Sequence, residues 1–302
     1  MKKILLYCSI MILAALLLTG CGSRPAAQIA ATTLPVYEFT VRLCEGTPLS
    51  VSRLVTEEVS CLHDYSLNVR QVKAAEAAEV IVISGAGLEE FMDDILINSK
   101  IIDSSAGIEL IVPQEHSHDH DDHDHDEPED DHEGHHHETD PHIWLSPANA
   151  GTMAANICRG LTGKYPEYKD VFADNLHQLQ LDLSALEEYG LTALEELSCR
   201  EIITFHDGFA YLAQAYDLTI LDAIEEESGS EASAKDLIQM IEEVEYHNLP
   251  AVFTEKSGSV SAAGIISRET GANEYALDMA MSGDSWFDAM YHNINTLKEA
   301  LQ

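Results

Sequence analysis

The 302-residue chain is 45% hydrophobic, which suffices for one large or two medium-sized globular units with substantial cores. Its 16 Lys and Arg against 53 Asp and Glu leave a formal net charge of −37, which argues strongly against binding nucleic acid or docking electrostatically onto anionic lipid head groups. Cations are the partners that this balance favours, although an acidic surface is also common where charge serves only solubility.

The N-terminus has the features of an export signal. Two lysines precede an apolar run over residues 4–18, which is shorter than the ~20 residues of a membrane-spanning helix. The run leads into LTGC, which resembles a bacterial lipoprotein signal in which Cys21 is acylated and becomes the first mature residue. We therefore expect a signal peptide over residues 1–20, a lipid-anchored tether over residues 21–27 and an extracytoplasmic location at the cell membrane. The alternative is an ordinary cleaved signal in which Cys21 has no role.

Cysteines are few beyond this junction. In an exported chain these four cysteines allow three patterns of disulfide pairing. Pairing Cys44 with Cys61 and Cys158 with Cys199 would close the shorter loops. Buried free thiols are the alternative. No C-x-x-C pair is present, so a thiolate metal site is not expected. The four residues are Cys44, Cys61, Cys158 and Cys199.

Short runs rich in β-branched residues alternate with helical patterns along both halves of the chain. In the first half, strands are predicted at QIAATTLP, LSVSRLV and EVIVISG, and helices at residues 36–43 and 69–78. In the second half, strands are predicted at EIITFH, LTILDAI, AVFTEK and EYALD, and a helical pattern follows each of them. This alternation is typical of α/β units with parallel sheets.

A long helix is predicted between the two halves, over residues 166–197, where apolar residues recur at helical spacing. It would be roughly 45 Å long at ~1.5 Å per residue, with Tyr189–Gly190 as a possible kink. The predicted fold class is therefore α/β, with two lobes of mainly parallel sheet joined by this bridging helix. The N-terminal lobe would cover residues 28–165 and the C-terminal lobe residues 198–302.

An acidic, histidine-rich tract over residues 115–139 interrupts the N-terminal lobe and is predicted to be a disordered loop, because it has no apolar residues with which to build a core. It contains a formal H-E-x-x-H sequence from His132 to His136, but Gly134 and the repulsion between acidic neighbours argue against the helix that a zinc-protease site needs. The histidines of the tract are His116, His118, His120, His123, His125, His132, His135, His136 and His137.

Side chains suited to metal binding follow several of the predicted strands. His206 ends one strand, Asp278 ends another, and His63 and His142 lie in loops of the first half. Ligands of α/β lobes gather at the carboxyl ends of strands and between domains, so these four residues predict a metal site in the cleft between the lobes. Taken singly, a histidine in a loop is more often solvated or a cap.

Four acidic residues lie beside or near these candidate ligands. Asp64, Asp140 and Asp207 could orient the imidazoles by accepting their hydrogen bonds, or could serve only as caps and turn formers. Glu255 ends the strand AVFTE and is a further candidate for such a supporting role. Imidazoles favour Zn²⁺, whereas a preponderance of carboxylates favours Mn²⁺ or Mg²⁺.

Taken in order, the stretches HDYSL, the histidine-rich insertion, DPHIWLSP, FHDGFAYLA, VFTEKSGSV and ALDMAMSGDSWFDAMYHNINTLKEAL resemble the zinc-specific solute-binding lipoproteins of bacterial ABC uptake systems, the ZnuA-like or cluster A-I type. The resemblance covers essentially the whole mature chain. It implies a two-lobed monomer that holds Zn²⁺ with His63, His142 and His206 and delivers it to an ABC permease and its ATPase subunit.

The fourth zinc ligand could be either Asp278 or a water molecule, because Leu62 stands where some relatives carry an acidic residue. The histidine-rich tract would be an accessory, low-affinity metal loop that raises the local zinc concentration, or a solvated loop with no part in transport.

Two other functions remain as alternatives. One is a manganese- or iron-binding member of the same family, although such relatives commonly carry a carboxylate at the position of His206. The other is an exported zinc-dependent hydrolase that keeps one coordination position for water and uses Asp278 or Glu255 as a base. We expect a transport protein with no catalytic residues.

Overall fold

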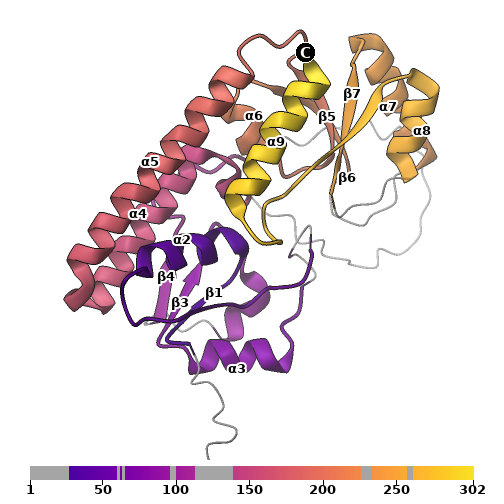
Figure 1. Ribbon diagram of the computed structural model, residues 1–302. Helices are drawn as coiled ribbons and strands as arrows, with labels where there is room; N and C mark the ends of the chain where they lie inside the picture. Colours follow the sequence, from indigo (N-terminus) through magenta and orange to yellow (C-terminus); the bar gives the residue numbers. More distant parts are fainter. Residues whose placement is uncertain are drawn as a thin grey trace, which may run out of the picture.

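The computed structural model describes residues 27–59, 62, 65–95, 100–112, 139–225, 233–256 and 261–302, which form two α/β lobes flanked by long helices (Figure 1). Several sequence predictions fall outside the described residues: the signal peptide, Cys21, Cys61, His63, Asp64 and the histidine-rich tract over residues 115–138. Within the described part of the chain, no helix has the length and apolar character needed to cross a membrane.

The N-terminal lobe contains a four-stranded parallel sheet in the order β2-β1-β3-β4. Its central strands are almost fully buried, because helices cover both of their faces. The sequence predicted β1, β2 and β3 and missed β4. The strands are β1 (Ile29–Ala31), β2 (Val51–Arg53), β3 (Val80–Ile83) and β4 (Ile101–Asp103).

The helices of this lobe begin at recognisable signals. The side chain of Asn68 accepts hydrogen bonds from two backbone N–H groups at the start of its helix, and Gln71 completes the capping box. Proline occupies the first turn of two other helices, where a missing N–H costs nothing. The elements are α2 (Leu34–Cys44), α3 (Val69–Ala77), α4 (Pro147–Lys164) and the 3-10 turns η1 (Glu90–Ile95) and η3 (Ile143–Leu145).

The predicted bridging helix is present as α5 (Lys169–Ala193), which follows the short 3-10 turn η4 (Pro166–Tyr168) and packs along α4 (Figure 1). It has 25 residues and is therefore about 37 Å long. The helix continues through Gly190, the proposed kink. A Cβ atom at Gly190 would lie 2.3 Å from the Tyr216 ring, so the glycine permits close packing against the C-terminal lobe.

The C-terminal lobe repeats the design of the first, with four parallel strands in the order β6-β5-β7-β8. All four strands and all four helices of this lobe were predicted from the sequence pattern. The strands are β5 (Glu201–His206), β6 (Thr219–Glu225), β7 (Ala251–Glu255) and β8 (Asn273–Leu277), and the helices are α6 (Ala210–Ala215), α7 (Ala234–His247), α8 (Ser261–Thr270) and α9 (Trp286–Leu301). The predicted α/β architecture of two parallel-sheet lobes with a long helix is thus confirmed.

Three cysteines can be assessed for the expected disulfides. Cys44, Cys158 and Cys199 are free thiols, so for these residues the alternative of unpaired cysteines is correct. Burial raises the pKa of Cys44 to about 12, so its thiol stays protonated and behaves as a small apolar side chain.

The two lobes are joined by more than the long helix. The loop after β8 is hydrogen-bonded to the N-terminal lobe through three of its carbonyls. The indole Nε1 of Trp144 donates to the Met279 carbonyl (2.8 Å), the Leu34 N–H donates to the Met281 carbonyl (3.2 Å), and the Arg53 guanidinium donates to the Gly283 carbonyl (2.7 Å). This loop belongs to the C-terminal lobe in sequence, but it is held by the other lobe.

The start of α9 is held in the same way. The carboxylate of Glu38, on α2, accepts a hydrogen bond from the backbone N–H of Trp286, and the Trp286 ring packs edge-to-face against Phe39 with centroids 5.1 Å apart. A carboxylate at a helix N-terminus also interacts favourably with the helix dipole. Burial raises the pKa of Glu38, and the charge that remains is compensated by these contacts. The predicted lobes therefore share one continuous hydrophobic core.

Candidate metal centre

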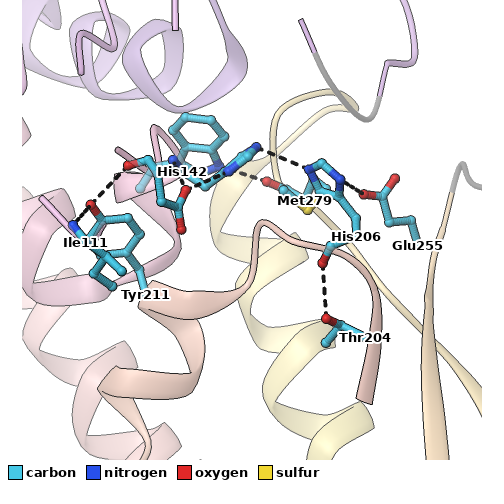
Figure 2. Close-up of polar contacts among 9 residues, drawn as sticks. Ile111, His142, Thr204, His206, Tyr211, Glu255 and Met279 are labelled. Atoms are coloured by element: carbon cyan, nitrogen blue, oxygen red, sulfur yellow. Dashed lines mark hydrogen bonds and ion pairs between the residues drawn. The ribbon is translucent and has the colours of Figure 1, made fainter. Parts of the chain in front are cut away.

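Two histidines from different lobes face one another at the junction. His142 precedes α4 and His206 ends β5, and their imidazole rings point toward each other (Figure 2). The two Nε2 atoms are 3.5 Å apart, the ring planes are perpendicular at 89°, and each residue is only 2% exposed. Residues 64 positions apart in the chain thus present two ring nitrogens to one point.

This separation matches what a shared zinc ion requires. Zinc binds imidazole nitrogen at ~2.0–2.1 Å with tetrahedral angles, so two ligand nitrogens of one ion lie about 3.3 Å apart. The observed 3.5 Å is close to that value and is long for a direct hydrogen bond between two nitrogens. The pair therefore has the spacing of two metal ligands.

The stretch DPHIWLSP determines the position of His142. Asp140 Oδ1 accepts hydrogen bonds from both the backbone N–H and the ring Nδ1 of His142, each at 2.8 Å. With the proton on Nδ1, the lone pair of Nε2 is free to bind a metal. The next residues form the buried turn η3, and the hydroxyl of Ser146 then caps α4. The predicted supporting role of Asp140 is thus consistent with the geometry.

Asp140 itself is anchored from the C-terminal lobe. The hydroxyl of Tyr211, on α6, donates to the Asp140 carbonyl (3.1 Å) and accepts from the Ile111 N–H (3.0 Å), and the Asp140 N–H donates to the Ile111 carbonyl (2.8 Å) (Figure 2). Burial raises the pKa of Tyr211, which keeps its hydroxyl protonated and able to donate. This network fixes the imidazole of His142 indirectly.

Replacing Asp140 by alanine is expected to weaken zinc binding by about 10- to 100-fold, because loss of an orienting acceptor typically costs that much. Asp140→Asn keeps an acceptor oxygen but removes the charge, so its loss should be smaller. A competition titration with a chromophoric chelator would measure both variants. If the alanine variant folded normally and bound zinc as tightly as the parent, Asp140 would have no orienting role.

The imidazole of His206 is also closely surrounded by other groups. The Thr204 hydroxyl donates to the His206 carbonyl (3.1 Å), and Nδ1 of His206 lies 3.8 Å from Oε1 of the buried Glu255. Gly208 leaves room for the ring: a Cβ atom there would lie 2.7 Å from Cδ2 of His206 and 2.7 Å from Cε of Met279. The position of the second imidazole therefore depends on the absence of a side chain two residues later.

Asp278, the predicted carboxylate ligand, has another partner in this conformation. Its Oδ2 lies 3.1 Å from Nζ of Lys256, and no group of three His, Cys, Asp or Glu side chains suited to a metal is found among residues the structure describes. His63, the third predicted imidazole, and its neighbour Asp64 lie outside those residues, and Asp207 is exposed. The structure thus brings together His142, His206 and Glu255.

Three contributors were not singled out from the sequence. Tyr211 reaches Asp140 across 71 positions, Gly208 matters only because the His206 ring folds back over it, and Lys256 meets Asp278 only when β7 and β8 pair. The one available hint was the parallel pairing of the two predicted strands, which places the residues that follow them side by side.

The family described as "ZnuA: Zinc-uptake complex component A periplasmic" matches residues 29–300. The chain belongs to the ZnuA family. The resemblance inferred from the sequence motifs is confirmed by this match. The zinc-binding lipoprotein AdcA of Streptococcus pneumoniae serotype 4 is 28% identical over 99% of the chain, and the zinc-binding protein AdcA of Streptococcus pyogenes serotype M3 is 27% identical over 90%. The chain spans about 61% and 55% of the length of these two relatives.

Solved ZnuA-family structures have the same fold. A crystal structure of ZnuA is 28% identical, covers 91% of this chain and 100% of its own, and superposes with a TM-score of 0.76. A ZnuA deletion mutant with zinc bound is 27% identical, covers 91% of this chain and 98% of its own, and has a TM-score of 0.73. The Zn(II)-bound ZnuA-like domain of S. pneumoniae AdcA, at 24% identity, covers 91% of this chain and 98% of its own, with a TM-score of 0.73.

Proposed function

We propose that this chain is the extracytoplasmic zinc-binding component of an ABC uptake system, which captures Zn²⁺ between its lobes and delivers it to a permease. The observation that carries the proposal is the pair of buried imidazoles from different lobes whose Nε2 atoms are 3.5 Å apart. Relatives of the ZnuA family that bear zinc in their names, and ZnuA structures with zinc bound, support the same ligand.

His63, His142 and His206 would hold the ion, and Asp278 or a water molecule would complete four-fold coordination. Asp140 and Glu255 would orient His142 and His206, while supporting roles for Asp64 and Asp207 rest on their place in the sequence alone. Three imidazoles favour Zn²⁺ over Mn²⁺, so manganese or iron binding is the less favoured function for this chain.

The partners follow from the family. A permease and its ATPase subunit would receive the ion, the protein would act as a monomer, and acylation of Cys21 would anchor it at the outer face of the cell membrane. A single acyl chain binds membranes only marginally, so the anchor would carry two or more chains.

Zinc binding and catalysis can be separated in one experiment. The mature chain, incubated with Zn²⁺ and dialysed against buffer, should retain the metal tightly, as measured by atomic absorption, and should not hydrolyse ester, phosphoester or peptide substrates. Loss of all zinc on dialysis would refute the binding role. Zinc-dependent hydrolysis that disappears with His206→Ala would instead favour the exported hydrolase, with Asp278 or Glu255 as its base.

We propose that the histidine-rich tract captures zinc at low affinity and raises its concentration near the main site. Deleting residues 115–138 is expected to lower the zinc bound per chain at high metal to about one ion, because only the site with fixed geometry would remain. Equilibrium dialysis at rising zinc concentrations measures the stoichiometry. Equal stoichiometry with and without the tract would contradict a capture role and leave a solvated acidic loop.

A further inference from the structure

The carboxylate of Asp278 is held firmly on one side. The backbone N–H of Asp278 donates to Oδ1 of Asn293 (2.7 Å), and Nδ2 of Asn293 donates to the Asp278 carbonyl (2.7 Å). Oδ1 of Asp278 accepts from the Ala280 N–H (2.8 Å). Asn293 is fully buried on α9, so this frame is rigid. These bonds occupy one carboxylate oxygen and leave Oδ2 for another partner.

That partner is a lysine from the neighbouring strand. β7 and β8 pair in parallel with Glu255 opposite Leu277, so the residues that follow them, Lys256 and Asp278, lie side by side beyond the carboxyl edge of the sheet. The Lys256 N–H donates to the Leu277 carbonyl (2.8 Å), and its ammonium lies 3.1 Å from Oδ2 of Asp278. The lysine side chain is 65% exposed, whereas the Asp278 side chain is only 15% exposed.

The two halves of this ion pair are therefore unequal. The carboxylate is fixed and nearly buried, and the ammonium is at the end of a flexible, mostly solvated chain. Ion pairs with exposed lysines are worth little, so a divalent cation with further ligands nearby can displace the ammonium readily. Lys256 is also one of only 16 basic residues in the whole chain, and it directly follows Glu255, the buried neighbour of His206.

We propose that Lys256 is a built-in competitor for the metal: its ammonium occupies Oδ2 of Asp278 and must be displaced when the ion binds. This rests on the proposed function, in which Asp278 is a zinc ligand. The lysine lowers the affinity for zinc and speeds its release, because zinc must break the ion pair to reach Oδ2 and the ammonium can re-form that pair as the ion leaves. Lys256 thus tunes the hand-over of zinc and does not itself bind it.

The test removes the charge while keeping most of the length of the side chain. Lys256→Met is expected to bind zinc about three- to tenfold more tightly than the parent and to release it correspondingly more slowly, in a chelator competition titration and a stopped-flow release assay. Lys256→Arg should resemble the parent. Lys164→Met removes the same charge from the exposed C-terminal end of α4, at the opposite end of that helix from His142, and should change neither quantity.

A double-mutant cycle assigns the effect to the ion pair. The gain from Lys256→Met should vanish in an Asp278→Asn background, because the competitor then has no carboxylate to occupy. A full gain in that background, or no gain in either background while the parent binds zinc tightly, would overturn the competitor role and leave the zinc-binding function intact. A parent protein that holds no zinc would overturn both proposals.

Discussion

His206→Ala should lower the affinity for zinc by about 100-fold. Zinc bound to structural sites contributes ~10–16 kcal/mol, so one of four ligands accounts for about 3 kcal/mol, and each 1.4 kcal/mol is tenfold in affinity. His206 is buried opposite His142, so its truncation to alanine removes one of the two imidazoles that face each other there. Competition against a chelator of known affinity, at a pH at which imidazole is unprotonated, measures the change.

His177 supplies the matched control for this experiment. It is an exposed histidine on α5, so His177→Ala removes one imidazole without touching the junction between the lobes. His247 is less suitable, because its ring lies between the carboxylates of Glu201 (2.9 Å) and Glu243 (3.4 Å) and helps to hold the end of α7. Equal losses of affinity in the His206 and His177 variants would show that His206 does not bind the metal.

Gly208→Ala is expected to weaken zinc binding by about 10- to 100-fold without adding any polar or charged group. The new Cβ would lie 2.7 Å from Cδ2 and 2.9 Å from Nε2 of His206, distances at which one of the groups must move. The ring can yield only by leaving its position opposite His142, and a ligand displaced by more than about 0.5 Å no longer has productive geometry. The same titration used for the histidine variants reads out the loss.

A glycine with free space around it provides the comparison. A Cβ atom added at Gly264, on α8, would meet no atom within 4 Å, so Gly264→Ala should leave zinc affinity unchanged and slightly favour the helix. Thermal unfolding of both variants separates a general loss of stability from a local effect on the ring. If Gly208→Ala bound zinc like the parent, the position of His206 would not limit affinity.

Local patterns were sufficient to predict most of the fold. Buried strands can be recognised from their β-branched and aromatic residues and from the polar or turn-forming residues on either side, as in VIVI, EIITFH and AVFTE. β4 was missed because it offers only two apolar residues, Ile101 and Ile102, before the polar Asp103, whereas β1 and β2, which are equally short, lie within longer runs that contain further apolar residues. The predicted helix 166–197 was longer than α5 because helix ends are the least regular part of such patterns.

The candidate site was predictable only in part. His142 and His206 could be found because they follow predictable elements and because the surrounding motifs resemble a family. The supports of the site could not be found, because each depends on a contact between distant segments: Tyr211 with Asp140, Met279 with Trp144, and Lys256 with Asp278. A contact between two distant segments cannot be predicted from the local composition of either segment.

The loop that follows Asp278 has a consequence for how ions come and go. The three hydrogen bonds that its carbonyls accept from the opposite lobe, at about 1 kcal/mol each, would all have to break if the two lobes moved apart as rigid bodies. Fewer than about one molecule in a hundred would then stand open at any time. We therefore expect loading and unloading to proceed through local rotation of side chains, with the body of the protein nearly rigid, so a membrane partner would have to distinguish full from empty by small changes at the rim.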